Sequence, residues 1–210
     1  MPNHVYHTIA VDEKYADKLE EISKVGICRY YLPIPTELKE TTAPNKEPDH
    51  VKLPLIQKYG SDNWYHWCNI NWGTKWGCYD SEYDDGVYRF TTAWSPFNDE
   101  IMDMLLADIP SLVWEWEEEQ GFGARTSYRD GRLLKYEDYD IIDWSEELEI
   151  PHPTLPHSAG TITLLEEPYH RLDEVYKPGW YADYSENEFL HKTKEGAIKE
   201  YKKGWLKYQN

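Results

Sequence analysis

Tryptophan is concentrated in one stretch of the chain, beside a lysine and two small polar residues. Indole rings stack on planar ligands, and a neighbouring ammonium can meet a phosphate or a carboxylate. The stretch therefore predicts a ligand- or partner-binding surface. The same rings could instead anchor a short helix to a sheet, with the lysine stem lying over a ring. Both interpretations concern Trp64, Trp67, Asn71, Trp72, Thr74, Lys75, Trp76 and Trp94.

A second pattern is the alternation of aromatic and acidic residues that begins at Val113. Alternate residues of a strand share one face and lie about 6.6 Å apart, so Glu115, Glu117 and Glu119 are expected in one row. This spacing is comparable to that of successive phosphates on a nucleic-acid strand. It predicts an acidic face that binds a partner with a basic groove. The alternative is an ordinary solvated face that binds nothing.

The sequence lacks the motifs that identify common enzyme classes. It contains no phosphate-binding GxxxxGK[ST] loop, no GxSxG turn and no HExxH helix, so no catalytic residue is predicted. His66, Cys68 and Cys78 do not have the ligand spacing of a zinc site. The run from Asp80 to Gly86 fails as a calcium loop because its glycine comes one place late. No metal and no cofactor are expected.

Composition limits the classes of partner. The chain has 210 residues, a formal net charge of −17, 10 Trp and 18 Tyr. Direct binding to nucleic acid requires clustered Lys and Arg, and an anionic membrane surface would repel this chain. Tyr and Trp are enriched at protein interfaces. The composition favours a partner protein with a basic surface, although acidity also serves solubility alone.

The cysteines and the N-terminal segment indicate the compartment. The three cysteines show no disulfide-framework spacing, and neither a signal peptide nor a membrane-spanning stretch is evident. We expect a cytoplasmic protein whose thiols are reduced and buried.

The order of expected elements indicates an α+β fold. It matches a ferredoxin-like split βαβ arrangement, an antiparallel sheet with helices on one face, with insertions and a C-terminal extension. The expected elements are a strand at Val5–Val11, a helix capped by Asp12, a strand at Ile27–Leu32, a loop at Glu40–Pro54, a Trp-rich helix ending at Gly73, a strand at Val87–Trp94, a helix after Asn98, a strand at Val113–Glu117 and a hairpin at Ala124–Tyr139.

Two regions are expected along the chain. Residues 1–139 would form the ferredoxin-like domain with the inserted Trp-rich helix. Residues 140–210 would form an acidic, proline-containing extension that ends in a basic amphipathic helix and packs on the same domain. The apolar stripe of that helix is predicted to dock on the acidic body and comprises Ile198, Tyr201, Trp205 and Tyr208.

Several short motifs resemble those of one known family. They are WYHW at 64–67, NWGTKW at 71–76, TAWSP at 92–96, LPIPTEL at 32–38 and EEQGFG at 118–123. Together they resemble the YubB-type ferredoxin-like domain family, which is found in phages, plasmids and other mobile elements. The resemblance spans a little under half of the chain. It implies a ferredoxin-like fold and a mobile-element origin, and it implies no activity.

Three functions are consistent with these patterns. The first is a non-enzymatic phage or mobile-element accessory protein that binds a host protein, either a defence factor or a nucleic-acid-processing factor, and interferes with it in the host cytoplasm. The second is sequestration of a small anionic ligand, such as a nucleotide signal, by the Trp and Lys75 region. The third is a hydrolase that acts on such a ligand.

Overall fold

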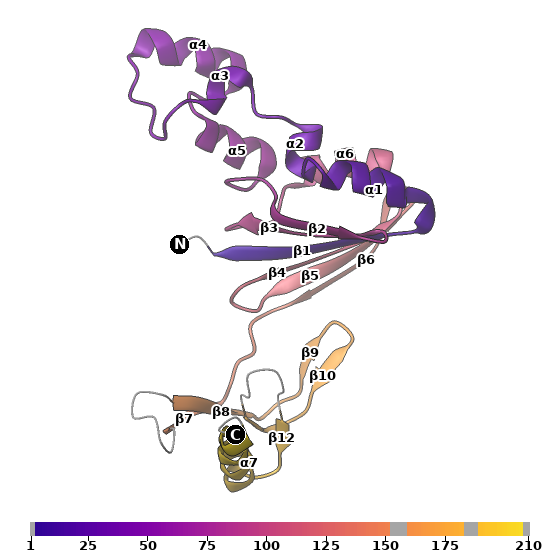
Figure 1. The fold of residues 1–210 in the computed structure, drawn as a ribbon, viewed down its shortest axis with the longest axis vertical. Helices are drawn as coiled ribbons and strands as arrows, with labels where there is room; N and C mark the ends of the chain where they lie inside the picture. The colour runs from indigo at the N-terminus through magenta and orange to yellow at the C-terminus, as the bar shows by residue number, and fades with distance from the viewer. Residues whose placement is uncertain (1–2, 152–158, 183–188, 208–210) are drawn as a thin grey trace. The chain divides into compact units, whose positions relative to one another are not determined.

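The computed structural model describes residues 3–151, 159–182 and 189–207. The chain divides into two compact units, Met1–Asp140 and Ile141–Asn210 (Figure 1). Each unit has its own sheet and its own buried core, and each is described by itself.

The first unit is built on a six-stranded sheet with the order β2-β3-β1-β4-β5-β6. Every neighbouring pair of strands is antiparallel. The strands are β1 His4–Val11, β2 Tyr79–Asp84, β3 Val87–Ala93, β4 Leu112–Glu118, β5 Gly123–Arg129 and β6 Arg132–Tyr139.

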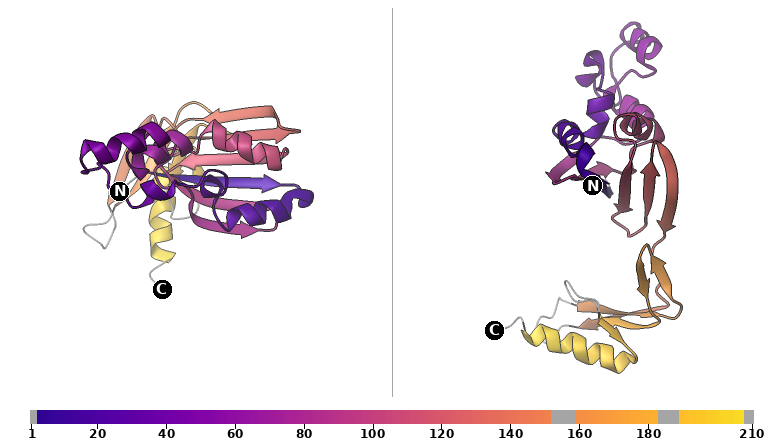
Figure 2. Two further views of the ribbon diagram at one scale, coloured as in Figure 1. Left: turned by 90° about the horizontal axis from the view of Figure 1, so that it is seen from above. Right: turned by 90° about the vertical axis from the view of Figure 1, so that its right-hand side faces the viewer.

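The helices of this unit form two groups (Figures 1 and 2). One group covers a single face of the sheet: α1 Ala16–Ser23, which follows a 3-10 turn at Glu13–Tyr15, α2 Ile27–Tyr31 and α6 Asp99–Asp108. The other group is inserted between α2 and β2: α3 Thr36–Lys39, α4 Asp49–Tyr59 and α5 Trp64–Trp72. The α+β class predicted from the sequence is confirmed.

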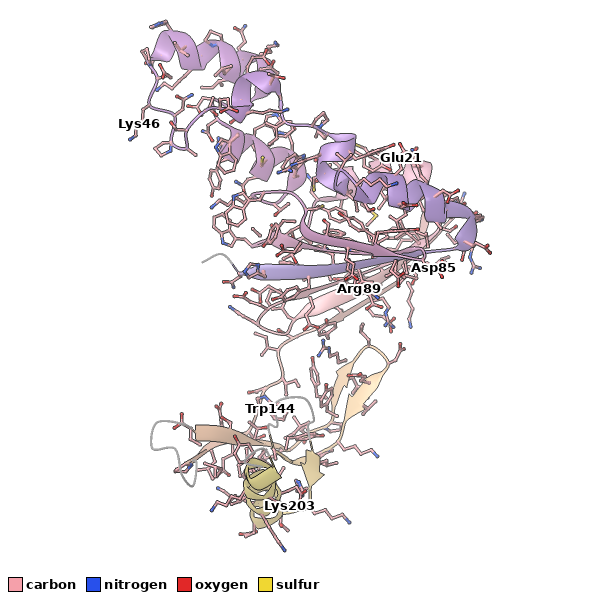
Figure 3. The ribbon with its side chains drawn as sticks, viewed as in Figure 1. Glu21, Lys46, Asp85, Arg89, Trp144 and Lys203 are labelled. Carbon is pink, nitrogen blue, oxygen red and sulfur yellow. The ribbon has the colours of Figure 1, made fainter. Side chains whose placement is uncertain are left out.

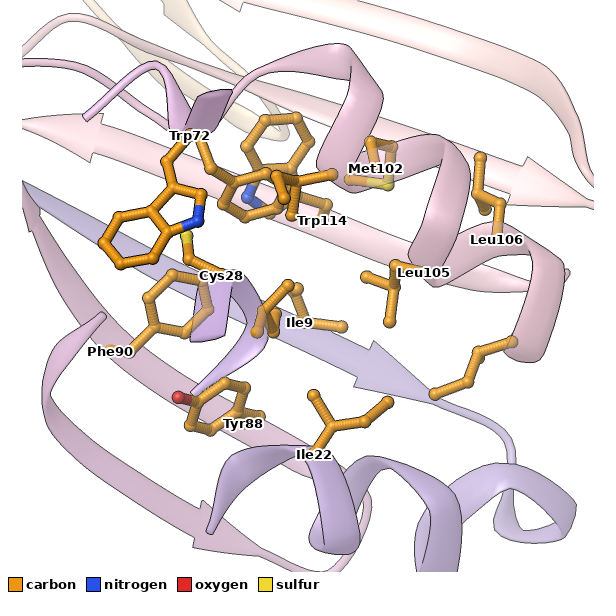
Figure 4. Packing of buried hydrophobic residues seen from close by; sticks show 14 of the residues in the cluster. Ile9, Ile22, Cys28, Trp72, Tyr88, Phe90, Met102, Leu105, Leu106 and Trp114 are labelled. Atoms are coloured by element: carbon orange, nitrogen blue, oxygen red, sulfur yellow. The ribbon is translucent and has the colours of Figure 1, made fainter. Parts of the chain in front are cut away.

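The core lies between the sheet and α1, α2 and α6 (Figure 4). Side chains alternate across β1, so that Val5, His7 and Ile9 are buried while Tyr6 is exposed. Ile9 meets Ile22 and Leu105 from the helices in one cluster. Each fully buried aliphatic side chain contributes about 1.5–3 kcal/mol, and this layer therefore fixes the helices on the sheet.

The prediction of a strand at Ile27–Leu32 is wrong, because this segment forms the helix α2. A short apolar run has the same composition in a buried strand and in a buried helix turn. Here Gly26, with φ 86°, reverses the chain after α1, and α2 then packs against α6. Ile27 and Cys28 are both fully buried by this packing.

Two further local predictions are corrected. The predicted loop at Glu40–Pro54 is shorter than expected, because α4 begins at Asp49 and contains Pro54. None of the α4 side chains is fully buried, so the helix lacks the apolar periodicity that would have revealed it. Asp12 makes no side-chain cap; its carbonyl oxygen accepts a hydrogen bond from the Tyr15 amide at 2.8 Å instead.

The hairpin predicted at Ala124–Tyr139 is confirmed by β5 and β6. Asp130 and Gly131 at its turn have φ values of 53° and 72°, as a two-residue turn with two left-handed positions requires. The hairpin continues the sheet beyond β4.

The second unit contains a four-stranded sheet with the order β12-β11-β8-β7 and a separate β9–β10 hairpin. Sequence patterns had indicated only an extension here. The elements are β7 Glu146–Pro151, β8 Ala159–Leu165, β9 Tyr169–Arg171, β10 Glu174–Tyr176, β11 Gly179–Ala182, β12 Phe189–His191 and α7 Lys194–Lys207.

Helix α7 packs on β11 and β12. Ala197 and Tyr201 are buried and Ile198 is partly buried against the same core. Gly160 on β8 makes room for the Tyr201 ring, since a Cβ at this position would overlap it. The predicted stripe therefore holds for Ile198 and Tyr201, while the side chain of Trp205 and the whole of Tyr208 lie outside the described residues.

Candidate binding site

The Trp-rich helix α5 ends in a loop that is tied to the end of β3. Asn63 caps the helix by accepting a hydrogen bond from the His66 amide at 2.9 Å, and Gly73 ends it with φ 75°. The buried Thr74 hydroxyl then donates to the Ala93 carbonyl at 2.9 Å and accepts from the Ala93 amide at 3.1 Å. The WGTKW and TAWSP segments are thereby held together.

Part of the predicted Trp set belongs to the core. Trp72 is 0% exposed and Trp67 is 4% exposed, and their rings meet edge to face with centroids 5.6 Å apart. The Trp72 indole N–H donates to the Leu32 carbonyl at 2.8 Å. Trp64 is partly buried against the same core. These three rings anchor α5, as the structural alternative predicted.

Asn71 is also used within the protein. Its side-chain amide donates to the Trp67 carbonyl at 2.8 Å, and its own carbonyl accepts from the Asn98 side chain at 3.1 Å. Asn71 and Thr74 therefore hold the loop in place rather than present polar groups to a ligand.

The remaining rings surround the ammonium of Lys75. Its Nζ lies 4.4 Å from the ring centre of Trp76, 4.7 Å from that of Trp94 and 5.8 Å from that of Tyr65. Trp76 is 37% exposed and Trp94 is 46% exposed. We call Tyr65, Lys75, Trp76 and Trp94 the Lys75 patch. Such distances are those of cation–π contacts, which contribute about 0.5–1 kcal/mol each at exposed sites.

Trp94 occupies a strained backbone position. Its φ is 74°, a left-handed conformation that costs roughly 1–2 kcal/mol for a residue with a Cβ. Its amide donates to the Asn3 carbonyl at 2.9 Å, and its ring meets Tyr65 edge to face at 6.2 Å. The surrounding structure thus fixes an exposed ring in a costly conformation, a feature that clusters at binding sites.

Tyr65 was missed by the sequence interpretation, in which tryptophans were the only aromatic residues considered. Its signal was weak, because Tyr65 stands in the same WYHW string as two anchoring rings. Only the fold brings it beside Trp94.

The acidic residues of β4 are engaged by neighbouring side chains. Arg125 Nε donates to Glu115 Oε1 at 2.5 Å, and the Tyr139 hydroxyl donates to Glu117 Oε2 at 2.7 Å. Glu119 follows the end of β4 and its carboxylate accepts from the His4 amide at 3.0 Å.

The sheet face that carries Glu115 shows charges of alternating sign. Arg89 lies on this face, away from the helices (Figure 3). The residues paired across the sheet in this row are Glu82, Arg89, Thr8, Glu115, Arg125 and Glu137. The carboxylate of Glu115 is therefore paired with a cation on the neighbouring strand β5, which weakens the likeness of the predicted row to a line of phosphates.

His7 forms a buried polar network that no sequence pattern indicated. The Trp114 indole N–H donates to His7 Nδ1 at 3.1 Å, so Nε2 carries the proton toward the Thr92 hydroxyl at 2.8 Å. The imidazole stacks on Phe90 at 4.5 Å. Burial lowers the pKa of His7 to about 3, and the ring is neutral at physiological pH.

Among the cavities lined by described residues, two adjoin the sheet of the first unit. One, of about 530 Å³, is lined by residues that include Asp12, Leu112, Tyr128 and Arg129. The other, of about 450 Å³, is lined by residues that include Trp116, Phe122 and Tyr139. Neither lining contains a member of the Lys75 patch, so this patch is a surface feature and not the wall of either cavity.

Among the described residues, no group of three or more His, Cys, Asp or Glu side chains is arranged to hold a metal ion. Within the same residues, no helix combines the length and apolar character needed to cross a bilayer.

Comparisons with protein-family models, with curated proteins and with solved structures found no match to this chain. The resemblance to the YubB-type family stays a prediction from the motifs.

Proposed function

We propose that this chain is a non-enzymatic binding protein that engages a basic host protein through the Lys75 patch. One observation carries the proposal: a cation is held over three aromatic rings, two of them tryptophans that are 37% and 46% exposed. Exposed, rigidly held Trp and Tyr rings are the residues that dominate binding energy at protein interfaces.

The arrangement of the rings favours a cationic group as their occupant. The patch already places one ammonium within cation–π distance of all three rings. A guanidinium stacks on aromatic faces better than an ammonium does because it is planar and more weakly hydrated. An arginine of a partner can therefore replace Lys75 over Trp76 and Trp94.

The net charge of the whole chain also favours a basic partner. A net charge of −17 attracts a basic partner from a distance and raises the rate of encounter. Because salt screens this attraction over about 8–10 Å, the association rate should fall as ionic strength rises.

The fold and the motifs support a mobile-element origin. The first unit runs β1, α1, β2, β3, α6, β4, and these strands are arranged in the order β2-β3-β1-β4. This order is consistent with the predicted ferredoxin-like split βαβ, in which α2 to α5 would be an insertion and β5–β6 an addition. Together with the family resemblance, it supports an accessory protein that interferes with a defence or nucleic-acid-processing factor in the host cytoplasm.

A second candidate is the binding of a small anionic ligand, such as a nucleotide, at the same patch. It is favoured by the position of Lys75, whose ammonium forms no ion pair with any carboxylate of the described residues. A base could stack on Trp76 or Trp94 while Lys75 meets a phosphate.

The Lys75→Ala variant separates the two candidates. If a partner's arginine replaces the ammonium, the variant binds an arginine-rich peptide at least as tightly as the wild type does. If Lys75 holds an anion, the variant loses nucleotide binding. Tryptophan fluorescence titrations with both probes measure this, and Lys46→Ala is the matched control because Lys46 is an exposed lysine in the inserted loop before α4 (Figure 3).

The host partner itself is tested by affinity capture from host lysate. The Trp76→Ala/Trp94→Ala double variant should lose a stoichiometric partner that the wild type retains, and Tyr136→Ala, which removes an exposed ring elsewhere, should keep it. Equal capture by the wild type and the double variant, or no stoichiometric capture at any salt concentration, contradicts the proposal.

A further inference from the structure

Two cysteines that are distant in sequence face each other in the first unit. The Sγ atoms of Cys28, on α2, and Cys78, directly before β2, are 4.0 Å apart. A disulfide bond requires about 2.05 Å between the sulfurs. A relative shift of about 2 Å would therefore join them.

The backbones of the two segments already approach closely, because each cysteine lies against a glycine of the other segment. A Cβ on Gly26 would lie 3.3 Å from the Cys78 Cβ, and a Cβ on Gly77 would lie 3.4 Å from the Cys28 Cβ. Both glycines have positive φ values, 86° and 68°. This crosswise packing brings the two backbone segments close together at the two cysteines.

The surroundings make the two thiols unequal. In the neutral pair the Cys78 thiol donates to Cys28 Sγ at 4.0 Å. Burial opposes ionisation of Cys78, but hydrogen bonding to its thiolate, first of all by the Cys28 thiol, lowers the Cys78 pKa. The hydrogen bond to Cys78, together with burial, raises the pKa of Cys28. Cys78 is only partly buried whereas Cys28 is fully buried. Cys78 therefore has the properties of an attacking thiol and Cys28 those of a resolving thiol.

Cys68 provides an internal contrast. It is buried, and burial raises its pKa to about 12, so it remains an unreactive thiol.

We propose that Cys28 and Cys78 form a redox-active pair that closes to an intramolecular disulfide when the protein meets a peroxide. The Cys78 thiolate attacks one oxygen of hydrogen peroxide, the O–O bond breaks, and Cys78 sulfenic acid and hydroxide form. The Cys28 sulfur then attacks the Cys78 sulfur, the S–O bond breaks, and water leaves with the Cys28 proton. The two thiols are oxidised, and the peroxide is reduced to two molecules of water.

The pair is positioned to act on the Lys75 patch. Cys78 ends the loop that carries Lys75 and Trp76, and Gly77 in this loop packs on both the Trp72 ring and Cys28; Figure 4 shows Cys28 beside Trp72. Closing the disulfide draws α2 and this loop toward each other, and the movement of the loop changes the environment of Trp76. This consequence does not depend on what the patch binds.

The experiment treats the reduced full-length protein with hydrogen peroxide and measures intact mass, free thiols and peptide maps. The wild type has three cysteines, and we expect one free thiol after oxidation, a mass loss of two hydrogens and a Cys28–Cys78 linked peptide that dithiothreitol removes. Cys68→Ser should form the same link and retain no free thiol. Cys28→Ser should instead accumulate a Cys78 sulfenic acid that dimedone traps.

The wild-type peptide map decides the outcome even if a cysteine variant fails to fold. A link that includes Cys68, a dimer joined between chains, or three free thiols after peroxide treatment overturns the proposal. A reversible change in the emission of Trp76, absent from a Trp76→Phe variant, supports the coupling to the patch. An unchanged emission in the linked protein overturns that coupling.

Discussion

Trp72, the last residue of α5, and Trp76, in the loop that follows, are only four positions apart, yet their environments are opposite. Trp72 is 0% exposed and donates a hydrogen bond to Leu32, whereas Trp76 is 37% exposed and packs on a lysine ammonium. Gly73 and Gly77 have φ values of 75° and 68°, and these two left-handed positions turn the chain between the rings. The comparison shows that one Trp-rich motif can supply both a core anchor and a surface for binding.

The largest test of this contrast is a pair of alanine substitutions. Trp72→Ala should destabilise the first unit by about 3–5 kcal/mol, as expected for a large buried ring. Trp76→Ala should cost less than about 1 kcal/mol, because it removes an exposed ring. Chemical denaturation measures the free energy of unfolding of both variants. Similar losses in the two would contradict the assignment of Trp72 to the core and of Trp76 to the surface.

The pH dependence of stability offers a second test of the buried core, because the core contains His7. The pKa of His7 is about 3 in the folded protein because of burial, against about 6.5 when unfolded. The unfolded state therefore binds the extra proton between these values, and stability falls as pH drops from about 6.5 to 3. Between pH 7 and 5 this single group should remove about 2 kcal/mol.

The control for this prediction is His7→Gln, which does not titrate. Since paired carboxylates also weaken in acid, the informative quantity is the difference in pH slope between the wild type and the variant. Equal slopes between pH 6.5 and 4 would contradict a neutral, buried imidazole.

Gly77→Ala tests the turn that separates the two rings. The new methyl group would meet the Trp72 ring at 3.1 Å with φ 68°, and strain plus crowding should cost about 1–3 kcal/mol. Gly60→Ala is the matched control, because Gly60 has φ 73° and nothing within 4 Å of a Cβ. Thermal denaturation should show a larger loss at Gly77 than at Gly60; the reverse order would indicate that the Trp72 contact is unimportant.

The smallest expected effect concerns the strain at Trp94. Trp94→Gly and Trp94→Ala both remove the ring, but only glycine adopts a φ of 74° without cost. The glycine variant should therefore be more stable than the alanine variant by about 1 kcal/mol. At Trp76, whose φ is not positive, alanine should be the more stable of the two. Denaturation curves that rank the Trp94 variants in the opposite order would show that this backbone is not strained.

Sequence patterns predicted the parts of the fold that local physics determines. The alternation in β4 and the Asp130–Gly131 turn each specify their structure within a few residues. Helix α2 was mistaken for a strand because its form depends on packing against α6, and α4 was not predicted because it buries no side chain completely. The strands of the second unit were missed because proline and acidic residues conceal their short apolar pattern.

The candidate site could be located from the sequence, but the sequence did not show which of its rings are buried and which are exposed. Tryptophan spacing alone does not tell which rings enter the core. That depends on where Gly73 and Gly77 turn the chain and on Thr74, which fastens the loop to β3. The Cys28–Cys78 pair had no signal, since 50 positions separate its members.

The central claim is that Trp76 and Trp94 are the binding rings of the motif while Trp67 and Trp72 are structural. Selective labelling of indole nitrogens allows each ring to be followed by NMR while an arginine-rich peptide is added. We predict saturable shifts of the Trp76 and Trp94 indole signals and unchanged Trp67 and Trp72 signals. Unmoved Trp76 and Trp94 signals with this peptide, and equally with a nucleotide panel, would contradict the account.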